Sequence, residues 1–299
     1  MFSILTPTYN RVKELPRVYK SLLNQTYTDF EWIISDDGSS DDTEEIVNGW
    51  KSKSNFDIIY HKMSKNQGKS YAVNEGLALC NHPYTIIADS DDTFDANTLA
   101  DLKIIWEGIE TTENANKIGA VWTLVQDEIG NLVGEPWPKN FWQVGFKERV
   151  LDRKQPIIGE KWHCWRTAVL REFKMYVHFN SFISESATWN NINTQYDFLC
   201  VNMIHRRYWL SEDGLIHKKK SYKDVQKVNY YTAYYHLKKS NLKEILFTGH
   251  YRDIAFDYTR SSLYYKDKQL KLKGNKLLSA WLIFLWCAPK KALLKLIAR

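Results

Sequence analysis

The sequence is poor in cysteine and lacks the cysteine spacings of disulfide-rich or zinc-binding domains. Its four cysteines, at positions 80, 164, 200 and 287, are widely scattered and include no Cys-x-x-Cys pair. The chain also opens directly on the strand-like Phe2–Leu5, without the charged and apolar pattern of a signal peptide. Together these features predict a reducing, cytoplasmic setting.

A long hydrophobic run is also missing. The most apolar stretch, residues 277–288, is too short to cross a bilayer comfortably, because a spanning helix needs about 20 residues. Lysines flank it on both sides, and Trp281 and Trp286 lie within it. This pattern predicts a helix that lies in a membrane interface. The alternative is an apolar helix that docks on the rest of the chain or on a second subunit.

Basic residues outnumber acidic ones, with 41 Lys and Arg against 35 Asp and Glu, and they crowd the C-terminal third. Examples are Lys218–Lys220, residues 266–276 and Lys290–Lys291. Such a surface attracts nucleic acid, anionic lipid or phosphorylated substrates, or it is simply solvated. Because no nucleic-acid motif accompanies it, we expect no nucleic-acid partner.

Strand and helix patterns alternate in the first half of the chain. Strands are expected over residues 2–6, 30–35, 58–61 and 84–88, and helices over 12–24, from 41, over 70–80 and over 97–110. A hairpin is expected where 121–126 and 132–134 flank Ile129-Gly130-Asn131. The alternation predicts an α/β fold with a mostly parallel, Rossmann-like sheet flanked by helices.

The second half is less regular. We expect helices over 159–172 and 185–193, a strand over 198–205, and a helical region from 221 onward. The predicted organisation is one domain over residues 1–215, followed by a helical C-terminal region over 216–299.

An acidic cluster ends the strand expected at 84–88. Asp89, Asp91 and Asp92 follow its apolar residues directly. Carboxylates gathered at one sheet edge repel one another unless a cation lies among them. Oxygen ligands favour hard metals such as Mg²⁺ or Mn²⁺, which complete their shell with water and phosphate oxygens. The alternative interpretation is an Asp-rich turn without a ligand.

Three further polar loops follow strands of the same expected sheet. They are Thr6–Arg11, Asp36–Asp41 and Asn66–Lys69. Because the carboxyl ends of parallel strands meet at one edge, we expect these loops to converge with the acidic cluster at a ligand site. Lys69 could meet a phosphate there, or it could be a solvated loop lysine.

These loops carry a recognisable set of motifs. They are Ile4–Asn10, Asn24–Glu31, Ser35–Asp41 and Ala88–Asp92. With them the chain resembles a family 2 glycosyltransferase of the GT-A fold, strongly over its first half and weakly over the next quarter. The resemblance implies a nucleotide-sugar donor, most often a UDP-sugar, and a divalent metal, Mn²⁺ or Mg²⁺. It divides the domain into a nucleotide-sugar half, about residues 1–125, and an acceptor half, about 126–215.

The resemblance also assigns roles to individual residues. Thr6, Tyr9 and Asp37 would bind the donor, with Thr6 and Asp37 at the base and ribose, and Lys69 would contact the diphosphate. Asp89 and Asp91 would form the metal motif, with Asp91 as the direct ligand. Asp92 would hold a water or a sugar hydroxyl.

The general base is assigned to Glu185, in Phe182–Trp189, although the commoner acidic pair is here Ser184-Glu185. The alternative is that Glu185 only caps its helix. Glu160 is the second choice for the base, in a segment where the resemblance places the acceptor. Trp162 and Trp189 could stack on sugar faces or could simply pack in the core.

The predicted function is that of an inverting, metal-dependent glycosyltransferase of the hexosyltransferase type, which moves a sugar from a nucleotide-sugar. The acceptor would be a hydroxyl of a glycan or a lipid-linked molecule in surface-polysaccharide assembly, at the inner face of the cell membrane. Two other functions remain open, a nucleotidyltransferase and a non-catalytic sugar- or lipid-binding protein of the same fold.

Overall fold

The computed structural model describes residues 1–153, 155–179, 181–210 and 221–297. The chain forms two compact units. The first unit consists of Met1–Gly145, Ile157–Met175 and Ile192–His217. The second unit consists of Phe146–Pro156, Tyr176–Asn191 and Lys218–Arg299.

The first unit is built on one sheet of nine strands in the order β3-β2-β1-β4-β8-β6-β9-β5, with β7 also paired to β9. The strands are β1 (Phe2–Thr8), β2 (Phe30–Asp36), β3 (Asp57–Lys62), β4 (Tyr84–Ile87), β5 (Thr93–Phe94), β6 (Ile118–Gln126), β7 (Trp142–Val144), β8 (Lys161–Arg166) and β9 (Asp197–Arg207). The first four strands in this order, β3, β2, β1 and β4, are mutually parallel, and β6 is parallel to β9. The expected parallel sheet is therefore confirmed for its first four strands, whereas the sheet as a whole is mixed because β8 runs antiparallel to both of its neighbours.

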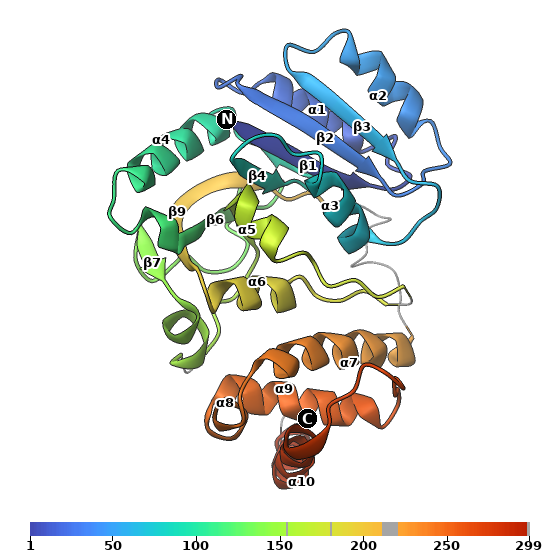
Figure 1. The fold of residues 1–299 in the computed structure, drawn as a ribbon, viewed down its shortest axis with the longest axis vertical. Coiled ribbons are helices and arrows are strands. Elements are labelled where there is room, and N and C mark those ends of the chain that lie inside the picture. Colours follow the sequence, from blue (N-terminus) through green and yellow to red (C-terminus); the bar gives the residue numbers. More distant parts are fainter. Residues whose placement is uncertain (154, 180, 211–220, 298–299) are drawn as a thin grey trace. The chain divides into compact units, whose positions relative to one another are not determined.

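Helices cover both faces of the parallel strands (Figure 1). The helices of the first half are α1 (Leu15–Leu23), α2 (Thr43–Lys51), α3 (Lys69–Leu77) and α4 (Thr98–Glu110), and a short 3₁₀ turn, η1, spans Ala115–Lys117. Helices α1, α2 and α4 pack on the face that carries Ile4 and Trp32. Helix α3 packs on the opposite face, where a Cβ on Gly76 would lie 2.3 Å from Leu5 Cδ1 and 2.9 Å from Ser35 Cβ.

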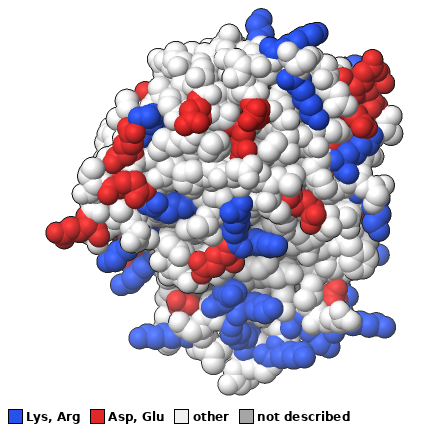
Figure 2. All heavy atoms as spheres, turned by 45° about the horizontal axis from the view of Figure 1, so that its top comes forward, with Lys and Arg blue, Asp and Glu red and all other residues white. Residues whose placement is uncertain are grey.

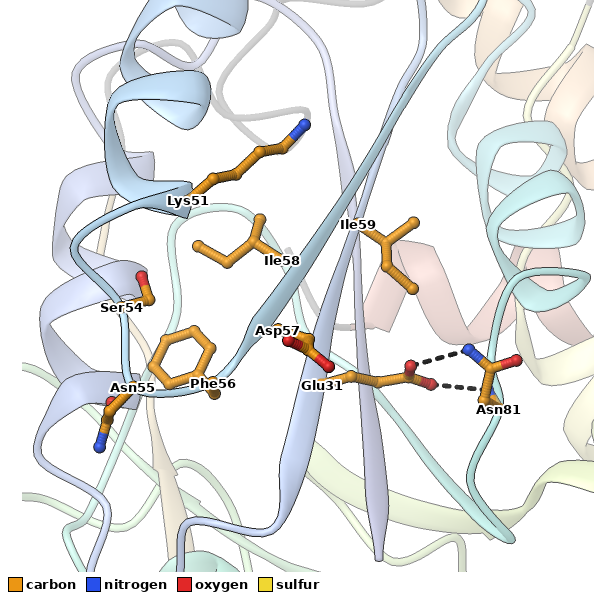
Figure 3. Close-up of a pocket in the computed structure, with 9 residues that line it drawn as sticks. All are labelled: Glu31, Lys51, Ser54, Asn55, Phe56, Asp57, Ile58, Ile59 and Asn81. Carbon is orange, nitrogen blue, oxygen red and sulfur yellow. Dashed lines mark hydrogen bonds between the residues drawn. The ribbon is translucent and has the colours of Figure 1, made fainter.

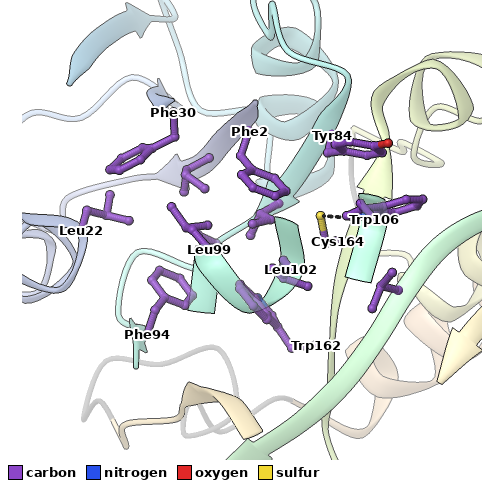
Figure 4. Packing of buried hydrophobic residues seen from close by; sticks show 14 of the residues in the cluster. Phe2, Leu22, Phe30, Tyr84, Phe94, Leu99, Leu102, Trp106, Trp162 and Cys164 are labelled. Carbon is purple, nitrogen blue, oxygen red and sulfur yellow. Dashed lines mark hydrogen bonds between the residues drawn. The ribbon is translucent and has the colours of Figure 1, made fainter. Parts of the chain in front are cut away.

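The core between the sheet and α4 is aromatic. Figure 4 shows the ring of Tyr84 stacked on that of Trp106, whose indole N–H donates to the sulfur of Cys164. Trp162 stacks on Phe94 at a centroid distance of 4.9 Å and is 2% exposed. These contacts join β4, β5 and β8 to the helix that follows the acidic cluster.

Two local expectations are corrected by the structure. Residues 159–172 do not form one helix, because β8 occupies Lys161–Arg166 and only Thr167–Glu172 are helical, as α5. The turn at Gly130 forms, with a φ of 93°, but residues 132–134 add only an isolated bridge from Leu132 to Gln126 rather than a strand.

The second unit is mainly helical. Its helices are α7 (Tyr222–Lys239), α8 (Leu242–Phe247), α9 (Gly249–Ser262) and α10 (Gly274–Ile297), with a π-helical turn, η2, at Lys147–Leu151. Helix α6 (Ser186–Asn193) begins in this unit. Polar caps set the starts of α7 and α8, since Ser221 Oγ accepts from Asp224 N and Asn241 forms a capping box with Glu244. No helix in the described ranges combines the length and apolarity needed to span a bilayer.

The division into two units differs in detail from the expected boundary near residue 215. Residues 146–156 and 176–191 pack with the C-terminal helices, because Phe146, Ile183 and Ala187 share a core with Tyr230 and Leu237. The boundary itself, at 215–216, and Lys218–Lys220 lie outside the described residues.

Candidate functional site

The loops after β1 and β2 are joined at the carboxyl edge of the sheet. The backbone N–H of Asp37 donates to Thr8 O at 2.8 Å, and that of Asn10 donates to Ser39 Oγ at 2.8 Å. Gly38 has a φ of +79°, and a Cβ there would lie 3.0 Å from the backbone of Lys65. Glycine therefore lets the turn after β2 approach the loop after β3, as the predicted convergence requires.

The carboxylate of Asp37 holds the loop after β3 through two hydrogen bonds. One oxygen of its carboxylate accepts from Gln67 N at 2.7 Å, and the other accepts from Gly68 N at 2.6 Å. The side chain is buried, and burial raises the pKa of Asp37 although these two N–H groups favour the charged form. The structure gives Asp37 a role in holding the start of α3, and its contact with the donor's base, expected from the resemblance, stays a prediction.

Thr6 and Tyr9 have different surroundings. Thr6 is fully buried, and its hydroxyl accepts from Trp32 Nε1 at 2.9 Å, so the structure gives it a packing partner within the core. Tyr9 is 44% exposed and remains available to a ligand. The hydroxyl of Thr8, which the sequence did not single out, is buried without a hydrogen-bond partner among the described residues.

Lys69 and Asp89 meet at this edge, as the predicted convergence implies. Lys69 is the first residue of α3, and its Nζ lies 2.5 Å from Asp89 Oδ1. Arg206 Nη2 lies 3.6 Å from the other oxygen of Asp89. Burial disfavours the charged form of Asp89, but Lys69 and Arg206 outweigh it and lower the pKa of the carboxyl.

Arg206, on β9, is a site residue that the sequence analysis missed. Its Nε lies 2.7 Å from Asp92 Oδ2, and both side chains are buried. Burial raises the pKa of Asp92 to about 7, against the opposing effect of Arg206. The available signal was the pair Arg206-Arg207 at the end of an apolar strand, which resembles an ordinary polar strand end.

Asp91 is the member of the cluster best suited to a metal. It is half-buried, and among the described residues its carboxylate takes part in no hydrogen bond or ion pair. Asp92 is buried, and neither of its carboxylate oxygens has a hydrogen bond of good geometry. Among the described residues, no three His, Cys, Asp or Glu side chains are grouped to hold a metal. The carboxylates of Asp89 and Asp91 are the hard oxygen donors that Mg²⁺ or Mn²⁺ takes, and a cation held by so few carboxylates would complete its shell with phosphate and water oxygens.

The acceptor-side predictions fall in both units. Glu160 is exposed just before β8 in the first unit, and Trp162 is buried in the core, which favours its packing role. Glu185 and Trp189 belong to the second unit. The carbonyl of Glu185 accepts from Thr188 N and Trp189 N, which places this residue at the start of α6, and Trp189 is buried. The role of Glu185 as base is not tested by these contacts.

A hollow lies at the opposite end of the strands, where β2 and β3 begin. It encloses about 590 Å³, and Figure 3 shows Glu31 within it, bonded to Asn81. The carboxylate of Glu31 accepts from Ser3 Oγ at 2.6 Å and from Asn81 N at 2.6 Å. Of the two acids that line this hollow, Glu31 is thus bonded within the protein, whereas Asp57 is exposed.

Comparison with known proteins points to the same half of the chain. A family model described as glycosyl transferase family 2 matches residues 3–164. The abequosyltransferase RfbV of Salmonella typhimurium is 37% identical over 105 residues, which is 34% of this chain and 32% of that protein. The chain thus spans about a third of the length of this relative.

Two solved structures share the fold. Residues 1–349 of S. aureus TarS in complex with UDP-GlcNAc superpose with a TM-score of 0.62 at 18% identity, covering 94% of this chain and 79% of that one. The mannosyltransferase PcManGT of Pyrobaculum calidifontis, in complex with GDP-Man and Mn²⁺, gives a TM-score of 0.57 at 16% identity, covering 99% and 79%.

Proposed function

This chain belongs to glycosyl transferase family 2, and from that premise we propose that it transfers a sugar from a nucleotide-sugar to an acceptor hydroxyl. The observation that carries the proposal is a continuous series of contacts at the carboxyl edge. Asp37 holds Gly68, Lys69 follows Gly68 and meets Asp89, and Arg206 joins Asp89 to Asp92. The series brings cations and carboxylates together at one edge of the sheet, which supports the proposal that a diphosphate and its counter-ion bind there.

The donor is proposed to be a UDP-sugar. The solved structure of TarS with UDP-GlcNAc, which shares the fold, supports a UDP-sugar as the donor. Tyr9 is exposed beside the loops, and its ring could cover a base. Lys69 would exchange part of its contact with Asp89 for the diphosphate, which keeps a positive charge next to the leaving group.

A divalent cation, Mn²⁺ or Mg²⁺, is proposed at Asp91, with Asp89 as its partner. When bound, it would neutralise the charge that develops on the diphosphate. Arg206 keeps Asp92 paired and holds it at the base of the cluster. PcManGT, whose solved structure contains Mn²⁺, supports this choice of ion.

The transfer is proposed to invert the anomeric carbon. The acceptor oxygen would form its bond to that carbon as the bond to the diphosphate breaks, and the diphosphate would leave with the electron pair. Glu185 stays the predicted base that takes the hydroxyl proton, on the strength of the resemblance alone. The acceptor is proposed to be a glycan or a lipid-linked molecule of surface-polysaccharide assembly, at the inner face of the cell membrane.

Release of nucleoside diphosphate from a panel of nucleotide-sugars tests this function. We expect release with one donor to require Mn²⁺ or Mg²⁺, to stop with EDTA, and to fall at least a hundredfold in Asp91→Asn. Asp57→Asn is the matched control, because Asp57 is an exposed Asp at the other end of the same sheet. Activity retained in Asp91→Asn would refute the metal assignment. Donor binding without turnover under all conditions would favour the non-catalytic alternative.

A further inference from the structure

Helix α10 presents an apolar stripe to solvent. We define the stripe as Leu278, Leu282, Leu285 and Trp286, whose side chains are between 56% and 63% exposed. Their spacing of four, three and one residues places them on one side of a helix. No charged residue occurs from Leu277 to Pro289, so nothing in this segment interrupts the stripe.

The other side of α10 accounts for its packing within the second unit. Ala280 and Ile283 are buried against the other C-terminal helices, and Phe284 stacks on Phe256 of α9 at 5.1 Å. The helix therefore has a core face of its own, and the stripe is apolar surface that stays more than half exposed beside it.

Cations surround the start of the helix. Lys276 Nζ donates to the carbonyls of Leu237 and Lys238, which brings the end of α7 beside α10. Lys238, Lys239 and Lys273 are exposed. Figure 2 shows blue Lys and Arg side chains gathered over the C-terminal helices, with little red between them.

The sequence separates charge in the same way. Residues 216–299 contain 19 Lys and Arg against 5 Asp and Glu, whereas residues 1–215 contain 22 against 30. The excess of positive charge is thus confined to the part of the chain that carries the stripe.

We propose that the stripe of α10 and the lysines beside it form a docking surface for an anionic lipid bilayer. The leucines and Trp286 would enter the interface, and the lysines would remain at the level of the anionic headgroups. A second copy of this chain fits the surface less well, because it would bring two strongly basic faces together. The proposal adds a membrane-binding surface to the proposed function, and it can be tested without any sugar transfer.

The test is co-sedimentation of the full chain with vesicles, in the absence of donor. One set of vesicles contains phosphatidylcholine alone, and the other also contains phosphatidylglycerol. We expect binding to the anionic set only, and we expect it to weaken as NaCl is raised. The double variant Leu282→Glu with Leu285→Glu should bind roughly tenfold more weakly or worse.

Two controls keep the test specific. Leu263→Glu changes a leucine that is 54% exposed, in the same unit but outside α10, and it should bind as the unchanged chain does. Lys238→Gln with Lys273→Gln should weaken binding about fivefold for each lysine, whereas Lys13→Gln with Lys53→Gln should not. Circular dichroism confirms that each variant is folded.

Several results would overturn the proposal. They are no binding of the unchanged chain to anionic vesicles, equal binding by the double leucine variant, and equal loss in Leu263→Glu. A concentration-dependent dimer in the absence of vesicles, abolished by the double leucine variant, would assign the stripe to a second copy of the chain instead.

Discussion

Arg206 Nε lies 2.7 Å from Asp92 Oδ2, although the two residues are far apart in the sequence. The short strand β5 explains their meeting. It begins at Thr93, directly after Asp92, and pairs antiparallel with β9 so that Phe94 faces Arg206. The pairing of β5 with β9 thus places the guanidinium of Arg206 at the acidic cluster, where the side chains of Arg206 and Asp92 are both buried.

Removing the guanidinium should destabilise the first unit. Arg206→Met leaves the carboxylate of Asp92 buried without its partner, which we expect to cost about 3 kcal/mol of unfolding free energy. Urea unfolding measures this loss. The double variant Arg206→Met with Asp92→Leu should lose less than Arg206→Met alone, because no charge is then left unpaired. Equal losses in the two proteins would contradict the pairing.

Asp37→Asn should loosen the loop that precedes α3. An amide has only one acceptor oxygen, so it can satisfy either Gln67 N or Gly68 N but not both in the present geometry. We expect a loss of about 1–3 kcal/mol in unfolding free energy and faster hydrogen exchange at those two amides.

The same variant separates the two roles of Asp37. If donor affinity falls while exchange at Gln67 and Gly68 stays unchanged, Asp37 contacts the donor directly, as the resemblance implies. If donor affinity and amide exchange change together, Asp37 affects donor binding by holding the loop. Asp57→Asn, at an exposed position on β3, should change neither measurement.

Gly76→Ala should be destabilising although alanine is the better helix former. The new Cβ would lie 2.3 Å from Leu5 Cδ1, so α3 or the sheet must shift, at a cost of about 1–3 kcal/mol. Gly49→Ala in α2 and Gly108→Ala in α4 are matched controls, since a Cβ at either position meets nothing within 4 Å. The controls should gain about 0.5–1 kcal/mol. Thermal unfolding midpoints that rise for all three variants would refute the contact.

Two histidines should make the second unit sensitive to acid. Burial lowers the pKa of His236 and of His250 to about 4, whereas an unfolded histidine titrates near 6.5. The unfolded state therefore binds protons first, and stability should be constant above about pH 6.5 and fall as the pH drops from there toward 4. Unfolding midpoints measured over this range test the direction.

The variant His236→Gln isolates one of the two histidines. It removes one of the two histidines whose pKa is lowered in the folded state, so the loss of stability between pH 6.5 and 4 should be smaller than in the unchanged chain. The same measurement on His61→Gln, at a half-exposed position on β3, serves as the control for removing a histidine outside the second unit. A slope that is the same in His236→Gln and in the unchanged chain would contradict the burial argument.

The first half of the fold was predictable because its signals are local. Each parallel strand is a short apolar run, each helix has its own apolar spacing, and the loops between them carry glycine and aspartate. The meeting of Lys69 with Asp89 follows from this order alone, since both residues come after strands of one parallel sheet.

The parts that were missed depend on partners distant in sequence. The strand β8 has only six residues and runs straight into α5 without a glycine or proline, so residues 159–172 resemble one helix until β4 and β6 are seen on either side. Nothing near Arg206 in the sequence indicates the acids that it meets. The loop-holding role of Asp37 likewise depends on backbone N–H groups beyond the next strand.

Gly76 lies near the opposite end of its helix from Lys69. Lys69 begins α3 and Gly76 lies two turns later, flat against β1 and β2. The missing methyl group at position 76 lets this end of α3 lie directly on the sheet. The same short helix carries Lys69 at its first residue, so close packing and the cation of the carboxyl edge belong to one element of nine residues.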